Sequence, residues 1–247
     1  MVRRGLRNTA EKSRNFRTRS DVEDTMTTTA VVVRPARINV LTWLGLGISL
    51  FSMLVIRQAF RAITTEPGTT LALLQEGCMF AAAAALLLLV RKGEGLPLTS
   101  IGIGTSPLWK SLAWGTVTAV ACMVPAVLIV TLTGYGHGAA SQAFAKLPLW
   151  VVTVVVTRAG IVEELFYRGF ALERLQALGV GKWLSWMIPL TIFAVGHWTG
   201  GGANIVIAFV LGGILTAFYQ WRRDLVANMF GHFLVDFIAN VLPALFS

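Results

Sequence analysis

Ionisable side chains cluster in the C-terminal half of a chain that is otherwise strongly apolar. The set that could carry chemistry is Glu163, Glu164, Arg168, His197, His232 and Asp236. A carboxylate beside an imidazole can activate water, because one group takes the proton while the other orients the nucleophile. Further polar groups can stabilise the negative charge that develops on a carbonyl oxygen. The residue types therefore favour a site in which an activated water attacks a carbonyl group.

Helical spacing separates the roles of the two adjacent glutamates in EELFYRGF, residues 163–170. Glu164 and Arg168 are four residues apart, so they share a helix face and can form an ion pair with the acid on the N-terminal side. Glu163 points about 100° away and lacks that local partner. We therefore predict that Glu164 is held by the arginine and that Glu163 is free to react. Taken alone, this helix would also fit a buried ion-pair network that only joins helices.

Two later segments add polar groups to the same half of the chain. In FAVGH, Phe193 and His197 share a helix face, and a four-residue repeat of polar side chains follows: Asn228, His232, Asp236 and Asn240. Such a stripe must face protein or water rather than lipid. A single histidine at membrane depth is typical of a hydrogen bond between helices. Two histidines with a glutamate and an aspartate on neighbouring segments favour catalysis instead, with Asn228 as a supporting residue.

The composition predicts a membrane protein. The chain has 247 residues, of which 55% are hydrophobic and 13% charged, and its mean hydropathy is +0.68. Apolar runs of about 20 residues, long enough to cross a bilayer, recur along it. We expect an all-α, polytopic transmembrane bundle of about seven or eight spans. The runs lie near 38–60, 69–90, 111–134, 148–168, 183–199, 204–221 and 225–246. One or two interfacial helices are expected as well, at 96–110 and 171–183.

The net charge of +9 is concentrated at the N-terminus and in a few turns. We interpret residues 1–37 as a basic, disordered cytoplasmic tail, with Met1 or Met26 as the start, and residues 38–247 as the membrane domain. No nucleic-acid partner is expected, because the tail forms no recognisable nucleic-acid-binding motif. The positive-inside rule predicts a cytoplasmic N-terminus, and we expect the plasma membrane of a prokaryote. Arg57 and Arg61 depart from the rule and could snorkel.

Four further residues inside apolar runs have structural interpretations. Cys78 and Cys122 are far apart in apolar surroundings, so we expect two small buried side chains and no disulfide. Glu76 is interpreted as a residue of the membrane interface. Arg158 is expected to be the structural partner of a carboxylate.

Three motifs on successive spans resemble one known family. EELFYR fits EExxxR, FAVGH fits FxxxH, and HFLVD fits HxxxN/D, in that order. Together they resemble the CPBP family, which includes the CAAX prenyl endopeptidases and the bacteriocin-processing or immunity (Abi) proteins. The resemblance covers residues 95–245, which form the CPBP-like core. It adds little for the tail and the first two spans.

The resemblance implies an intramembrane endopeptidase that uses glutamate and histidine. By position, Glu163 and His197 would activate a water, His232 and Asp236 would form the oxyanion site, and Glu164 and Arg168 would brace the site. Asp236 replaces the neutral asparagine found in well-characterised members, so it must be protonated or must orient His232. No cofactor is required by this chemistry. A zinc-dependent version stays open, with Glu163, His197 and His232 as ligands.

Other functions are also open at this point. A non-proteolytic scaffold or bacteriocin-immunity protein would bind a peptide in the same cavity, and a transporter could use the polar groups as a proton relay. The expected partners are the lipid bilayer and a peptide or protein substrate, such as a lipidated tail or a peptide leader.

One geometric condition applies. His197 lies about 10 Å deeper than Glu163 by residue counting, so its span must start inside the bilayer, tilt, or bend at Pro189.

Overall fold

The protein is described by a computed structural model over residues 40–64, 68–133 and 146–246. Every regular element within these ranges is a helix, and no strand occurs in them. The all-α prediction is therefore confirmed. The basic tail, both candidate start sites and most of the Gly/His stretch before residue 146 lie outside the described residues.

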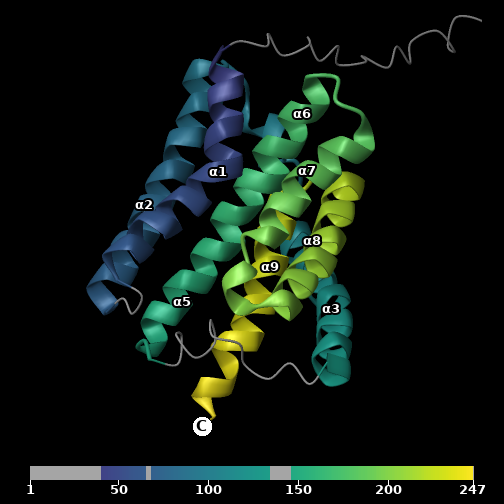
Figure 1. Cartoon of the computed structure of the whole chain (residues 1–247). Helices are drawn as coiled ribbons and strands as arrows, with labels where there is room; N and C mark the ends of the chain where they lie inside the picture. The colour runs from purple at the N-terminus through teal and green to yellow at the C-terminus, as the bar shows by residue number, and fades with distance from the viewer. Residues whose placement is uncertain (1–39, 65–67, 134–145, 247) are drawn as a thin grey trace, which may run out of the picture. The chain divides into compact units, whose positions relative to one another are not determined.

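Eight α-helices run through the described part of the chain, with short π- and 3₁₀-segments between them (Figure 1). The α-helices are α1 Val40–Ile63, α2 Thr69–Leu88, α3 Leu108–Thr133, α5 Leu149–Arg158, α6 Glu173–Ala177, α7 Lys182–Val195, α8 Gly202–Arg222 and α9 Leu225–Asn240. The π-segments are η1 Leu89–Gly93, η3 Ala159–Glu163 and η4 Leu165–Leu172. The 3₁₀-segments are η2 Leu98–Ile101, η5 Trp198–Gly200 and η6 Leu242–Leu245.

Four helical stretches in the described residues are long and apolar enough to cross a membrane. They are Val40–Ile63, Thr69–Gly93, Leu108–Leu132 and Gly202–Arg222. Two further apolar helices, α7 and α9, are shorter, with 14 and 16 residues. Each predicted apolar run thus contains a helix, but the count of seven or eight spans is not confirmed.

The EELFYRGF segment lies in a long helical rod that runs without a break from residue 149 to residue 177. The rod consists of α5, the two π-segments η3 and η4, and α6. A π-segment inserts extra residues into a helix and is frequent at functional sites. Residues 171–177 continue this rod, so the expectation of a separate helix over 171–183 is wrong, while the interfacial position of this segment stays a prediction. The other expected surface segment, 96–110, holds only η2 and turns before α3 begins.

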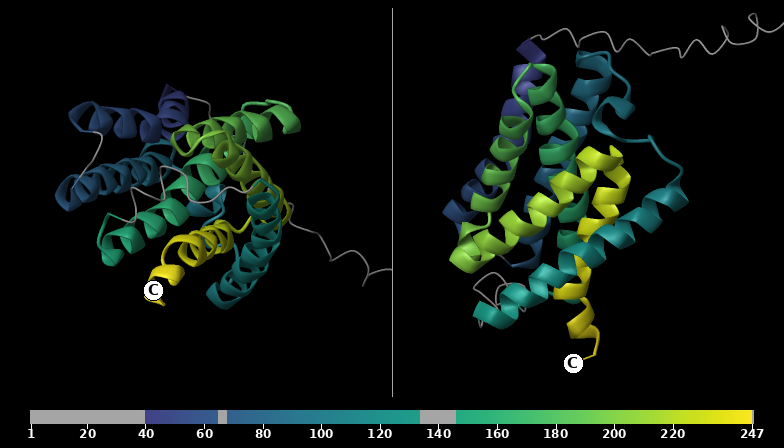
Figure 2. Two further views of the ribbon diagram at one scale, coloured as in Figure 1. Left: turned by 60° about the horizontal axis from the view of Figure 1, so that its bottom comes forward. Right: turned by 90° about the vertical axis from the view of Figure 1, so that its right-hand side faces the viewer.

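Glycines let α9 approach its two neighbours closely. A Cβ on Gly115 of α3 would lie 2.7 Å from the carbonyl oxygen of Ala227, and one on Gly231 would lie 2.9 Å from the carbonyl oxygen of Gly115. Small residues of this kind allow transmembrane helices to pack backbone to backbone. Figure 2 shows α3 crossing α9. On the other side, a Cβ on Gly160 of the rod would lie 2.8 Å from the carbonyl oxygen of Met229. α9 is thereby held directly against the rod beside the glutamate pair.

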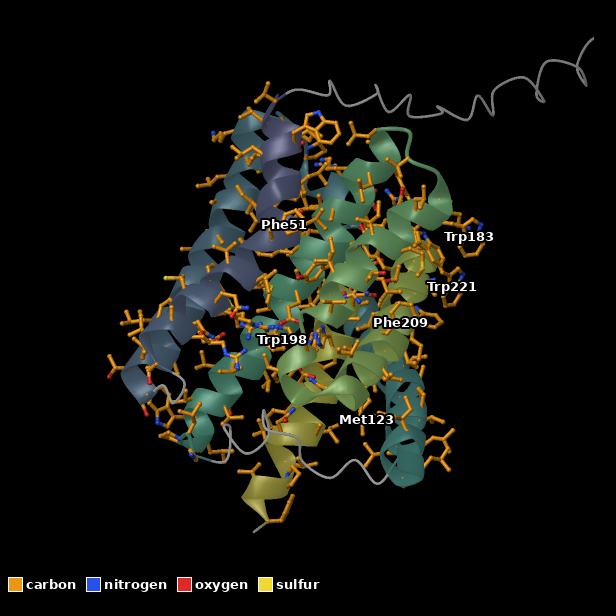
Figure 3. All side chains as sticks on the ribbon, in the orientation of Figure 1. Phe51, Met123, Trp183, Trp198, Phe209 and Trp221 are labelled. Atoms are coloured by element: carbon orange, nitrogen blue, oxygen red, sulfur yellow. The ribbon has the colours of Figure 1, made fainter. Side chains whose placement is uncertain are left out.

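Large apolar side chains also point outward from the bundle. Trp183 and Trp221, labelled in Figure 3, are 72% and 65% exposed. Such exposure is ordinary for a surface that faces lipid, since lipid tails are as apolar as the side chains. Both described cysteines are unbridged, as expected; Cys122 is buried, but Cys78 is exposed rather than buried.

Candidate active site

Glu163, the last residue of η3, is buried and held by two arginines. Its Oε1 accepts hydrogen bonds from Nη1 of Arg158 at 2.6 Å and from Nη2 of Arg57 at 3.2 Å. The prediction that Glu163 is unpaired is therefore wrong. Its partners escaped the helical-spacing argument because Arg158 lies one residue beyond an i, i+4 pair and Arg57 comes from α1.

Arg158 also binds Glu76 of α2 through Nε, and both side chains are 3% exposed. Arg158 is thus the partner of two carboxylates, which confirms its expected structural role. The interpretation of Glu76 as an interface residue is wrong, because its carboxylate is buried and paired with the buried guanidinium of Arg158. Within the described residues, Oε2 of Glu163 has no hydrogen-bond partner. One oxygen of Glu163 is therefore anchored, and the other is available to a water or substrate.

Glu164 is completely buried and fully engaged. Its Oε1 accepts from Nη1 of Arg168 at 2.8 Å, as the spacing predicted, and lies 2.8 Å from Nδ1 of His232. Its Oε2 accepts from Nδ2 of Asn228 at 3.1 Å. The Asn228 amide also donates to the carbonyl oxygen of Leu215 at 2.9 Å, so α9 is tied to α8 at this point. Glu164 therefore fixes the orientation of His232, and Asn228 supports it.

The guanidinium of Arg168 contacts residues of both α8 and α7. Nη2 donates to the carbonyl oxygen of Gly212 at 3.0 Å, and Nε donates to Oγ1 of Thr216 at 3.3 Å. The guanidinium carbon lies 4.5 Å from the centroid of the Phe193 ring, a cation–π contact. Gly212 leaves the necessary room, since a Cβ there would lie 2.9 Å from Nη2. Arg168 therefore contacts α7 and α8 in addition to Glu164 of its own rod.

His197 follows the end of α7 and lies in the turn before η5. Its Nδ1 is 2.8 Å from the carbonyl oxygen of Phe193. Because a carbonyl oxygen only accepts, we assign the proton of the neutral ring to Nδ1, which leaves Nε2 as an acceptor. A ring in this state can accept a hydrogen bond from a water at Nε2.

Glu163 and His197 line one cavity of about 210 Å³. The walls come from α1, the rod and α7, and they are largely apolar, with Phe51 and Leu54 of α1 among them. Phe51 is labelled in Figure 3. The volume lies below the roughly 300–1,000 Å³ of a site that encloses a drug-sized ligand, so it suits a short stretch of a larger substrate. Residue counting had placed the two side chains at different depths, but α7 is a short helix that contains Pro189 and ends at Val195, just before His197, so both side chains reach the same cavity.

His232 and Asp236 are not among the residues that line this cavity. The Phe193 ring contacts both imidazoles, with centroids 4.8 Å from His197 and 6.1 Å from His232. Asp236 is 30% exposed, and its Oδ2 is 3.6 Å from Nε2 of His232, which is too long for a direct hydrogen bond. The structure thus places Glu163 and His197 on one cavity and brings Glu164 into contact with His232, while Asp236 makes no direct bond to either histidine.

Residues 145–238 match the family model described as type II CAAX prenyl endopeptidase Rce1-like. The match spans all three motifs. The resemblance to the CPBP family is confirmed. A search of curated proteins and a search of solved structures found no match. The Rce1-like family is a protease family, which supports a peptidase at the family level. Together with the four long apolar helices, the match identifies an integral membrane protein.

The residues of this Rce1-like segment do not fit the zinc alternative. Across residues 40–64, 68–133 and 146–246, no group of three or more His, Cys, Asp or Glu side chains is arranged to hold a metal ion. Glu163 lies beside two guanidinium groups, whose positive charges oppose the binding of a cation at its carboxylate. We therefore derive no step through a metal.

Sequence reasoning missed several residues that shape the site. Arg57 was assigned to snorkelling, Glu76 to the interface, and neither Gly212 nor Thr216 was singled out. A signal existed for the two ionisable residues, because each one inside an apolar run needs a partner at membrane depth. Gly212 and Thr216 carry no such signal, since glycine and threonine are common in packed transmembrane helices.

Proposed function

We propose that the protein is an intramembrane endopeptidase in which Glu163 and His197 activate a water. The observation that supports this most strongly is that these two side chains, from different helical elements, line one cavity. The match to a protease family over residues 145–238 supports the same reaction class. The catalytic residues then come from the rod and from the turn after α7.

The proposed reaction is hydrolysis of a peptide bond. Oε2 of Glu163 takes a proton from the water while Nε2 of His197 accepts the other hydrogen bond and orients the oxygen for attack on the carbonyl carbon. Glu163 then passes the proton to the leaving amine as the C–N bond breaks. The products are a carboxylic acid and an amine, so the atoms and protons balance without a covalent enzyme intermediate.

His232 is proposed to stabilise the oxyanion of the tetrahedral intermediate, with Asp236 as a supporting residue. Glu164 holds His232 by Nδ1, so Nε2 is the nitrogen that can face the substrate. A ring with protons on both nitrogens donates from Nε2 to the oxyanion. Asp236, 3.6 Å from Nε2, is proposed to orient this ring rather than to contact the oxyanion, because an ionised carboxylate would repel it.

The proposed membrane arrangement has about seven spans and a cytoplasmic N-terminus in the plasma membrane of a prokaryote. The rod, α7 and α9 would join the four long helices as spanning elements. The start of α1, the end of α2, and α6 lie at one end of the bundle (Figure 1). Cationic residues gather on the connections at that end, including Arg91, Lys92 and Lys182. The positive-inside rule places such connections in the cytoplasm.

The proposed substrate is a peptide or protein that reaches the site from the bilayer or its surface. Prenylated tails, peptide leaders and transmembrane segments all supply apolar side chains for the cavity walls formed by Phe51, Leu54 and Val195. The bilayer is the second partner, and no nucleic-acid partner is proposed.

One observation favours a second candidate, a non-proteolytic scaffold or immunity protein with the same cavity. Two guanidinium groups on Oε1 of Glu163 weaken it as a proton acceptor, since they stabilise its charged form. In that case the glutamate would serve to join α1 to the rod. Binding of a peptide without cleavage would then be the function.

Peptide cleavage by the purified protein in detergent separates the candidates. Prenylated tail peptides, leader peptides and apolar segments are incubated with the wild type and with Glu163→Ala, each with and without a chelator, and the products are mapped by mass spectrometry. The proposal expects a defined internal cut by the wild type and none by Glu163→Ala. Equal cleavage by both proteins would refute the mechanism, and peptide binding without any cut would favour the scaffold. Loss of activity on chelation would point to the zinc-dependent version.

A further inference from the structure

His197 is carried by a turn rather than by a helix, so its position depends on what holds that turn. Gly196 caps the C-terminus of α7, and Trp198 begins η5 directly after the histidine. Several hydrogen bonds hold the turn, among them His197 Nδ1 with the Phe193 carbonyl oxygen at 2.8 Å, the His197 amide to the Ala194 carbonyl oxygen at 3.0 Å, and Asn204 Nδ2 of α8 to the His197 carbonyl oxygen at 3.1 Å. These contacts fix the shape of the turn. They do not fix its distance from the rod.

α1 contacts the turn on both sides of His197. Nη1 of Arg57 donates to the carbonyl oxygen of Gly196 at 3.3 Å, and the guanidinium carbon of Arg61 lies 5.2 Å from the centroid of the Trp198 ring. The two arginines are four residues apart and so share one face of α1. Trp198 is labelled in Figure 3. The residues immediately before and after the histidine are therefore both held by the same helix.

Arg57 also joins the turn to the carboxylate of the proposed base. Nη2 donates to Oε1 of Glu163 at 3.2 Å while Nη1 binds Gly196. A cation at the C-terminus of a helix such as α7 is favourable, because the last carbonyl groups point outward without partners. A guanidinium can bind two acceptors at fixed spacing, whereas a lysine ammonium is a single point charge. One side chain thus sets the separation of Glu163 from the turn that carries His197.

We propose that Arg57 and Arg61 are positioning residues through which α1 holds His197 in register with Glu163. The expected change in kcat rests on the proposed function. The expected change in the position of His197 rests on the contacts of Arg57 and Arg61 alone. α1 lies outside residues 145–238, so this assignment gives a function to a helix that the family match does not include. It also gives a reason for two arginines at a place where the positive-inside rule disfavours them.

Steady-state kinetics on a cleaved peptide provide the first test, with Arg61→Gln compared with Arg91→Gln. Arg91 is an exposed arginine of η1 and serves as the matched control. Arg61 does not line the cavity, so we expect kcat to fall about two- to fivefold with KM unchanged, the size of an exposed cation–π contact. Arg61→Lys should restore kcat, because an ammonium also binds the Trp198 ring. Arg91→Gln should match the wild type.

Arg57 is tested by its conservative variant. Loss of a hydrogen bond to a charged group corresponds to about a ten- to hundredfold loss, so Arg57→Gln should lower kcat by that factor. Arg57→Lys should fail to restore it, since a point charge cannot bridge Gly196 and Glu163. Rescue by lysine would overturn the bridging role. Should Arg57 variants fail to fold, the exposed Arg61 carries the test.

Nuclear magnetic resonance of the full chain labelled with ¹⁵N-histidine gives a readout that needs no catalysis. The chain has three histidines, and His197→Gln assigns the relevant ring signals. We expect Arg61→Gln to shift the His197 signals more than those of His232, and Arg91→Gln to shift neither. If the wild type cleaves no peptide, the proposed function fails and this spectrum alone decides the positioning claim. Identical His197 signals in Arg61→Gln and Arg91→Gln would overturn it, as would a shifted signal with unchanged kcat in an active enzyme.

Discussion

Adjacent glycines in α8 allow the bracing of Glu164 to be tested by a single methyl group. A Cβ on Gly212 would lie 2.9 Å from Nη2 of Arg168, from Cδ1 of Leu190 and from Cε1 of Phe193. A Cβ on Gly213 would meet only Cδ2 of Leu190, at an ordinary 3.9 Å. Gly212→Ala therefore pushes on the arginine that holds Glu164, and Gly213→Ala is its matched control.

The two variants should differ in stability by a predictable amount. Both gain about 0.5–1 kcal/mol from the better helix propensity of alanine. Gly212→Ala loses about 1–3 kcal/mol by overpacking, because Arg168 is fixed by Glu164, Thr216 and the Gly212 carbonyl and cannot move without losing a contact. The difference between the variants is then about 1–3 kcal/mol, and Tm changes by roughly 2–4 °C per kcal/mol for a chain of this length.

Thermal unfolding in detergent and peptide cleavage are measured on the same preparations. We expect Gly213→Ala to keep the Tm and the activity of the wild type or to gain slightly in Tm. Gly212→Ala should unfold several degrees lower and cleave more slowly, since displacement of Arg168 also disturbs the Glu164–His232 contact. Equal Tm and equal rates for both variants would refute the claim that the Arg168 contacts position the site.

Three further predictions concern the other carboxylates and the metal. Glu76→Gln leaves Arg158 buried with one carboxylate fewer, so the free energy of unfolding should fall by about 3–5 kcal/mol; a fall below 1 kcal/mol in denaturant titration would contradict the buried pair. Asp236→Asn should keep kcat within about threefold of the wild type, because asparagine keeps the size and an acceptor oxygen of the side chain that lies 3.6 Å from His232 Nε2; a loss above about 100-fold, the range of a proton-transfer group, would make the carboxylate essential. Prolonged dialysis against a chelator should leave the cleavage rate unchanged, and restoration of a lost rate by zinc would reverse that conclusion.

Local features of the site could be predicted from the sequence, while the partners from distant helices could not. The Glu164–Arg168 pair follows from a four-residue spacing within one helix, and the structure has it at 2.8 Å. The partners of Glu163 include Arg57, which is 106 residues away, and Arg158 meets Glu76 across 82 residues. Helical periodicity shows which face a residue occupies but not which helix packs there. Such pairings therefore needed the three-dimensional arrangement.

The error at 171–183 has a specific physical origin. An amphipathic pattern with charges on one face is the same whether those charges meet water or partners inside the bundle. Here Glu173 accepts from the Tyr219 hydroxyl at 2.8 Å, and Arg174 binds Glu94 at 2.8 Å, so both charges are used internally. The rod consequently continues to residue 177, and no separate helix forms over 171–183.

The central claim is that Glu163 is the proton acceptor for the attacking water. The most direct measurement is kcat for one defined peptide with the wild type and with Glu163→Gln, which keeps the size of the side chain but cannot take the proton. Removal of a general base predicts a fall of about 10²–10⁴-fold, in a protein that still binds the peptide. A kcat for Glu163→Gln within a few-fold of the wild type would contradict the account.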